Sequence, residues 1–194
     1  MPHIQAIKKA MFDQKMPKEI IEQFTFSQTE ENIVEEVVSL LNQMDKLLTE
    51  EQRLSIMEED GCYKTGQADE MNASFGRIHE GKTVEERIAL FNDENVHPNV
   101  PCHVNADGTL TVFWEIGEKG FYHCVCAQFN KLKENQPQTK NITKTFCGCC
   151  GGHIRHHYQN ILGVKLKLIE IVSSPISSNG EKRCEFLFEI MSST

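Results

Sequence analysis

The chain of 194 residues contains eight cysteines, whose thiols can bind metals, act as nucleophiles or undergo oxidation. Five of them form two groups, Cys124-Val-Cys126 and Cys147-Gly-Cys149-Cys150, and the second group is followed by Gly-Gly-His153. In a reducing compartment, clustered thiols bind metals or take part in catalysis more often than they form disulfides. The sequence therefore points first to metal or thiol chemistry.

The spacing of each group indicates how its sulfurs would be positioned. Residues 121–127 alternate in the manner of a strand, where positions i and i+2 share a face, so Cys124 and Cys126 would project together. The second group lies in a glycine-rich turn at a helix start, where several thiols can converge. The partial positive charge of a helix N-terminus would lower the pKa of a thiol placed there.

Two groups of thiols that meet in space would supply a tetrahedral sulfur site for Zn²⁺, or the ligands of an iron–sulfur cluster. The Cys-x-Cys spacing differs from the Cys-x-x-Cys of zinc knuckles, so buried and chemically inert thiols are the alternative. Cys62 and Cys102 are lone cysteines that could complete the site, whereas Cys184 lies on the apolar face of a predicted strand. The predicted metal ligands are Cys124, Cys126, Cys147, Cys149, Cys150 and His153.

Nucleophilic and redox chemistry are two further interpretations of the same thiols. Cys147 or Cys150, with His153 nearby, would act as a nucleophile toward an amidine or thiazoline carbon. Alternatively, Cys149 and Cys150, or the two groups, would pair under oxidation in a thiol redox sensor.

The helix predicted after the second group ends at Gly163. His157 and Tyr158 follow its apolar side and are expected in the core. Arg155 and His156 are expected at the surface, where Arg155 could bind an anionic ligand. Adjacent residues lie about 100° apart around a helix, so at most one of the two neighbouring histidines should face a given cavity.

These candidate residues need a fold that brings distant segments together. Helical periodicity and capping boxes dominate the first half, whereas strand-like alternation follows Pro98 and Pro101. Helices are predicted at 17–25, from Ser27 to Leu48, at 49–61 and from Thr83, and strands at 110–116, 121–127, 164–168 and 184–190. The polar stretch 128–146 is expected to be an exposed loop, and Ser177 to Gly180 a hairpin turn.

The pattern indicates an α+β fold, with a helical region over residues 1–95 and, over 96–194, an antiparallel sheet of about four strands with a packed helix, in one integrated domain. A net charge of −8 argues against nucleic acid and against anionic membranes. With no bilayer-length apolar run and no recognisable signal peptide, a cytoplasmic location is expected. The helical half is compatible with a homodimer.

The segment from Phe146 to Ile190 resembles the C-terminal part of the four-vinyl-reductase domain and of the L-2-amino-thiazoline-4-carboxylic acid hydrolase-like family. The shared features are Cys147 at a helix start, Leu162-Gly163, Glu170, Gly180 and the strand Cys184-Glu-Phe186-Leu-Phe188. The Cys124-x-Cys126 hairpin and the helix end before Cys62 are similar to those of cysteine-rich, uncharacterised bacterial relatives. Ser173 and Ser174 stand where the vinyl-reductase pattern often has a cysteine.

The resemblance implies an α/β fold with an antiparallel sheet and a pocket for a small hydrophobic or anionic ligand, sometimes near a metal. Together with the cysteine groups it favours a small-molecule-binding or sensory domain with a cysteine-rich metal site. The alternatives are a hydrolase of cyclic amidines or amides that uses a Cys thiolate, and a thiol redox sensor.

Overall fold

The computed structural model describes residues 2–25, 33–59, 64–94, 96–97, 99–126, 129–130 and 142–191. It confirms the predicted α+β class: helices occupy the chain as far as Asp93, and the strands of the main sheet begin at Cys102. The predicted capping box at Ser27 and the lone cysteine Cys62 lie outside the described residues. No helix in the described part of the chain is long and apolar enough to cross a membrane.

The main sheet has four antiparallel strands in the order β1-β2-β6-β5. The strands are β1 (Cys102–Val104), β2 (Leu110–Trp114), β5 (Lys165–Ser173) and β6 (Cys184–Met191). Strand β6 lies in the middle, where Phe186 pairs with Val112 on one side and Phe188 pairs with Leu168 on the other. These alternate residues point to one face and are almost completely buried. A short second hairpin, β3 (Gly117–Glu118) and β4 (Phe121–Tyr122), stands apart from this sheet.

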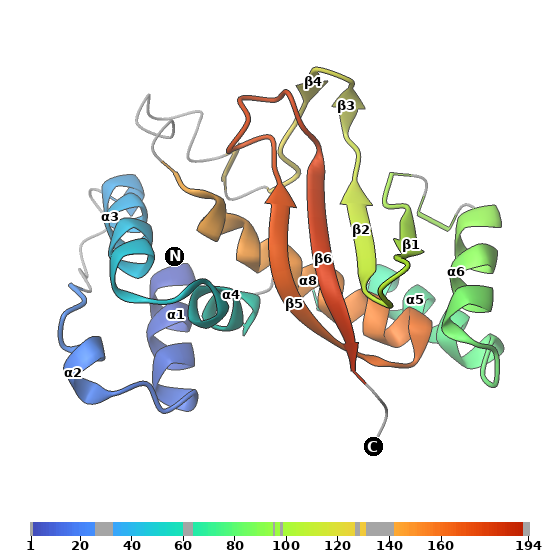
Figure 1. Ribbon diagram of the computed structural model, residues 1–194, viewed down its shortest axis with the longest axis horizontal. Helices are drawn as coiled ribbons and strands as arrows, with labels where there is room; N and C mark the ends of the chain where they lie inside the picture. Colours follow the sequence, from blue (N-terminus) through green and yellow to red (C-terminus); the bar gives the residue numbers. More distant parts are fainter. Residues whose placement is uncertain are drawn as a thin grey trace.

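Helix α8 (Gly148–Leu162) runs across the buried face of the sheet (Figure 1). Its apolar residues Ile154, Ile161 and Leu162 are buried, and it ends at Gly163, whose φ of 70° is the left-handed conformation that favours glycine after a helix. The helix and the sheet face together enclose the core of the C-terminal half.

In the described part of the chain, six further helices precede the sheet: α1 (Pro2–Asp13), α2 (Lys18–Ile21), α3 (Ile33–Leu47), α4 (Glu50–Glu59), α5 (Gln67–Ile78) and α6 (Val84–Asp93). Helices α1 to α4 gather beside strand β5, whereas α5 and α6 lie toward β1 (Figure 1). Helices α4, α5 and α6 all pack on α8, so α8 contacts both the sheet and the helical layer. The predicted capping boxes at Thr49 and Thr83 are both formed.

Glycines allow α8 to approach its neighbours closely. A Cβ added at Gly152 would overlap the backbone carbonyl of Glu58 in α4, and one added at Gly148 would overlap the side chain of Met57. The Gly-rich stretch was expected to form a turn before the helix. Instead, Gly151 and Gly152 belong to the helix itself, and their role is close packing rather than chain reversal.

Other sequence predictions differ from the structure for identifiable reasons. The strand expected over 121–127 stops at Tyr122, so Cys124 and Cys126 lie beyond it. The stretch 128–146 is not an exposed loop throughout, because Ile142 and Phe146 are buried and a 3-10 helix spans Lys144–Cys147. The helix expected over 17–25 shrinks to the four residues of α2. Helices α1 and α5 were not predicted, although apolar residues recur at helical spacing in both, such as Ile4, Ile7 and Met11 in α1.

Candidate functional site

Helix α8 positions both groups of chemically capable side chains. Cys149 and Cys150 lie in its first turn, directly after Cys147, and the histidines follow one to two turns later. The two groups face different neighbours: the cysteines meet the segment after strand β4, whereas the histidines meet α5 and the end of β2. The helix therefore carries a thiol cluster at its start and an imidazole cluster near its middle.

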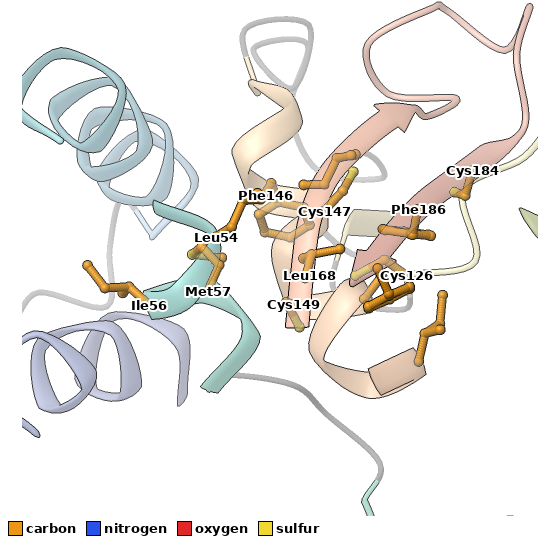
Figure 2. Close-up of a cluster of buried hydrophobic side chains, with 14 of the residues drawn as sticks. Leu54, Ile56, Met57, Cys126, Phe146, Cys147, Cys149, Leu168, Cys184 and Phe186 are labelled. Atoms are coloured by element: carbon orange, nitrogen blue, oxygen red, sulfur yellow. The ribbon is translucent and has the colours of Figure 1, made fainter. Parts of the chain in front are cut away.

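The two predicted groups of thiols do come together in the interior. The side chains of Cys126 and Cys150 form a hydrogen bond, and Cys147 lies close enough to Cys124 and Cys126 for their charges to interact. Figure 2 shows Cys126 and Cys147 near Phe186, in the apolar interior between the sheet and α8. The five cysteines of the two predicted groups, together with Cys184, are called the thiol cluster below. Its members are Cys124, Cys126, Cys147, Cys149, Cys150 and Cys184.

Two members of this environment were not predicted as site residues. Cys184 was assigned to the core, and it is buried, but its thiol also interacts with those of Cys147, Cys124 and Cys126. Ser174, which is fully buried, forms a side-chain hydrogen bond with Cys147. A serine that was not among the predicted site residues therefore lies beside the thiols.

Burial reverses the expected acidity of these thiols. The apolar surroundings raise the pKa of Cys147 to about 12, although a hydrogen bond from Ser174 opposes the change. The pKa of Cys150 is also raised well above its usual value, by its hydrogen bond with Cys126 and by burial. The prediction of a lowered pKa at the helix N-terminus is wrong, because losing water around a thiolate costs more than the helix dipole returns.

The geometry of potential metal ligands differs between the two clusters. Among the described residues, one group of three ligand atoms lies mutually within 4.8 Å, and it consists of Asp69, His156 and His157. No three described sulfurs of the thiol cluster all lie within that distance of one another. The predicted cysteine ligands therefore gather in one place without forming a closed coordination shell, and a metal bound to them stays a prediction.

The remaining lone cysteine in the described chain, Cys102, lies outside the thiol cluster. It is buried on strand β1 and forms a side-chain hydrogen bond with Tyr158. Burial raises its pKa to about 12. Cys102 is thus a packing residue of the sheet edge.

A pocket of about 90 Å³ lies between α5, α8 and the end of β2. Apolar side chains such as Val100, Ile154 and Tyr158 line it together with a small number of polar groups. The exposed Ala68 also lines the pocket, so the cavity reaches the surface near the start of α5. Besides Tyr158, whose hydroxyl donates to the Val100 carbonyl, the polar or aromatic side chains that line it are those of Asn72, His97, Trp114, His153 and His157.

Asn72 connects two of the pocket histidines. Its amide nitrogen lies 3.0 Å from Nδ1 of His157, and its amide oxygen lies 3.0 Å from Nε2 of His97. Asn72 is 2% exposed and His157 is 5% exposed, so each polar group satisfies the other where water is excluded. Burial, and to a smaller degree the neighbouring His157, lower the pKa of His97.

His153, the predicted alternative metal ligand, lines this pocket. Its ring stacks on that of Trp114, with centroids 5.5 Å apart, and contacts the His157 ring at a centroid distance of 4.5 Å. The i, i+4 spacing of the two histidines places them on one face of α8. The expectation that His157 and Tyr158 belong to the core is confirmed, since both are buried.

Arg155 does not offer a free guanidinium for an anionic ligand. It forms ion pairs with Glu58, at 2.6 Å, and with Glu59, at 3.0 Å. The Glu58 side chain is 7% exposed, and burial raises its pKa despite the nearby arginine. Arg155 therefore links α8 to α4, and these ion pairs disfavour the binding of an anionic ligand by its guanidinium.

Several residues of the pocket and its surroundings were missed from the sequence. Asp69 and Asn72 belong to α5, a helix that was not predicted, and His97 belongs to the irregular connection before the sheet. Trp114 was recognised only as a strand residue. The one available signal was the group of three histidines, His153, His156 and His157, whose partners are set by packing rather than by sequence spacing.

Comparison with known proteins assigns no family. No protein-family model matches the chain, and no curated protein matches it. Among solved structures, the chain is similar to an H-NOX protein from S. oneidensis in the Fe(II)NO ligation state, with 10% sequence identity and a TM-score of 0.34, over 97% of this chain and 98% of the other. A likeness this distant identifies neither the family nor the ligand of the present chain.

Proposed function

We propose that this chain is a small-molecule-binding domain of the sensory type, with its ligand held in the pocket between α5, α8 and β2. The observation that carries the proposal is the convergence of three imidazoles, one carboxamide and one indole on a cavity with otherwise apolar walls. A few polar groups placed in an apolar cavity are typical of ligand sites.

The size and chemistry of the pocket restrict the ligand. A volume of about 90 Å³ is well below the several hundred Å³ typical of drug-sized ligands, so the occupant has few heavy atoms. Imidazole rings donate hydrogen bonds through N–H, and they offer no negative charge. Neutral imidazoles also accept hydrogen bonds, and the other walls are apolar, so the pocket favours a small uncharged compound, such as a small carbonyl compound, over an ion.

The chain provides its own reporter for this proposal. Trp114 lines the pocket and is the single tryptophan of the sequence, so its fluorescence reports on this cavity alone. We expect titration with a small carbonyl compound such as acetamide to produce a saturable change in Trp114 emission, and sodium chloride to produce none.

A matched pair of variants separates pocket binding from bulk effects. Ala68→Leu adds bulk at the mouth of the pocket and should abolish the change, whereas Gln67→Leu, at the exposed neighbouring position, should leave it intact. An emission change that is linear in acetamide concentration, or equally large in Ala68→Leu, would contradict the proposal.

The resemblance to the four-vinyl-reductase and amino-thiazoline hydrolase-like families supports a ligand-binding role more than a hydrolytic one. The landmarks of that resemblance are Cys147 directly before α8, Gly163 after it, and Cys184 at the start of β6. A hydrolase would need a thiolate in contact with substrate. Cys147 is instead 3% exposed with a pKa of about 12, which disfavours a nucleophilic role.

A metal bound by the thiol cluster is a second candidate function. It is favoured by the meeting of Cys126 with Cys150, and of Cys147 with Cys124, from segments that are distant in sequence. A bound Zn²⁺ or iron–sulfur cluster would deprotonate these thiols and draw the sulfurs together.

Metal analysis of protein purified with and without oxygen tests this second candidate. We expect about one equivalent of zinc or a stoichiometric amount of iron, lost in Cys126→Ser and Cys150→Ser but retained in Cys102→Ser, whose thiol lies outside the cluster. Less than about a tenth of an equivalent of any transition metal in both preparations would count against the site.

A further inference from the structure

We propose that Asp69, His156 and His157 bind a divalent transition-metal ion where α5 meets α8, at a site separate from the thiol cluster. Oδ1 of Asp69 lies 2.8 Å from Nε2 of His156 and 3.9 Å from Nδ1 of His157, and all three atoms lie within 4.8 Å of one another. Ligand atoms around a tetrahedral zinc ion are about 3.3 Å apart, given bonds of about 2.0 Å. Small side-chain adjustments would therefore bring the three atoms to distances at which they can coordinate one ion.

Two adjacent histidines can reach one carboxylate here because they use different ring nitrogens. Neighbours on a helix point about 100° apart, so identical atoms of the two side chains could not converge. His156 reaches Asp69 with the distal Nε2, whereas His157 faces it with the proximal Nδ1. The rings stand nearly perpendicular, at 81°, with centroids 5.2 Å apart.

Two carboxamides hold these groups in place. Nδ2 of Asn160 donates to Oδ1 of Asp69 at 3.0 Å, and the Asn72 amide lies against His157. Side-chain partners of this kind orient metal ligands and are part of many metal sites. Rotation of the Asn72 amide by half a turn would present its oxygen toward the ion and keep a hydrogen bond with His97.

The donor set selects the class of metal. Two imidazoles and one carboxylate suit Zn²⁺, Fe²⁺, Co²⁺ and Ni²⁺ rather than the oxygen-seeking Mg²⁺ and Ca²⁺. The side chains of Asp69 and His156 are 27% and 31% exposed, so an ion can enter and water can complete its coordination shell. The inference depends neither on a pocket ligand nor on metal at the cysteines.

Cobalt titration of the chelator-stripped full chain tests the site. Thiolate ligands give Co²⁺ an intense near-ultraviolet charge-transfer absorption that nitrogen and oxygen ligands lack, so the two candidate metal sites are distinguishable. We expect the double variant Cys126→Ser, Cys150→Ser to bind one equivalent of Co²⁺ by calorimetry without that absorption.

Substitutions at the proposed ligands should weaken this binding specifically. Asp69→Asn preserves the shape of the side chain and should lower the affinity for Co²⁺ by about tenfold or more, whereas the exposed Glu70→Gln and His103→Gln should leave it unchanged. His156→Gln, at a partly exposed position, repeats the test should Asp69→Asn disturb the circular dichroism spectrum. Failure of the stripped cysteine variant to bind Co²⁺, or unchanged affinity in both ligand variants, would overturn the proposal.

Discussion

At the scale of single residues, the polar groups between α5 and α8 depend on one another. Asn72 is almost fully buried and contacts two histidines through the two ends of its amide. A buried polar group is costly without a partner, and a single substitution can leave such a group exposed to an apolar environment. Asn72 is thus the residue whose loss should be felt most strongly in this region.

Replacing Asn72 by leucine should destabilise the protein by about 1–3 kcal/mol, because the ring nitrogens of His157 and His97 would face an apolar side chain of similar volume. Urea unfolding of the full chain measures the change. Gln23→Leu is the matched control, since its exposed amide donates to the carbonyl of Glu19 in a short helix. Equal stability of the two variants would show that the Asn72 contacts contribute little.

At the scale of elements, helix α8 is the piece on which both clusters depend. It packs against α4, α5 and the sheet at once, and its glycines set how near α4 and β5 can come. Gly151 and Gly152 are adjacent, yet an added Cβ would meet different obstacles. At Gly151 it would meet the flexible end of Leu168, and at Gly152 the backbone of Glu58.

The two alanine substitutions should therefore differ in their effect on unfolding free energy. Each gains up to about 1 kcal/mol of helix propensity. Gly152→Ala should nevertheless destabilise the protein by about 2 kcal/mol or more, because the rigid backbone of α4 has to move, whereas Gly151→Ala should stay within about 1 kcal/mol of the parent. Chemical denaturation of both variants gives the comparison, and a tolerated Gly152→Ala would contradict the close contact between α4 and α8.

At the scale of the whole molecule, thiols from distant segments share one interior. Folding removes water from Cys102 and Cys147 and raises the pKa of each from 9.0 to about 12. The folded state therefore retains these protons at pH values where the unfolded chain has released them. The stabilisation is complete below about pH 9 and is lost as the pH rises toward 12.

The free energy of unfolding should consequently fall between pH 7 and pH 9.5, by about 0.8 kcal/mol for each buried thiol with such a shift. Urea titrations in the presence of a chelator and a reducing agent measure this decrease without interference from metals or disulfides. Cys102→Ala removes one of the titrating groups and should show a shallower decrease. A stability that is constant or rising over this range would contradict the burial of the thiols.

The sequence by itself determined the features that depend on local pattern. Capping boxes at Thr49 and Thr83 begin helices, alternation in β2 and β6 marks strands, and Gly163 ends α8. These signals are readable because helix ends and strand faces are set by residues within a few positions of one another. The presence of eight cysteines likewise pointed correctly to a thiol cluster, although not to its high pKa values.

Only the tertiary structure decided which side chains meet. Asp69 and His97 lie 87 and 60 positions before the histidines that they approach, and no local pattern records that proximity. The exclusion of water also depends on distant parts of the chain, because every element packed around Cys147 contributes to its burial. The effect of burial, which raises the pKa of this thiol, is therefore larger than the opposite effect of the helix N-terminus. The residue types of the chain determine which chemistry is available, and the packing of α8 against the helices and the sheet determines where the side chains form sites.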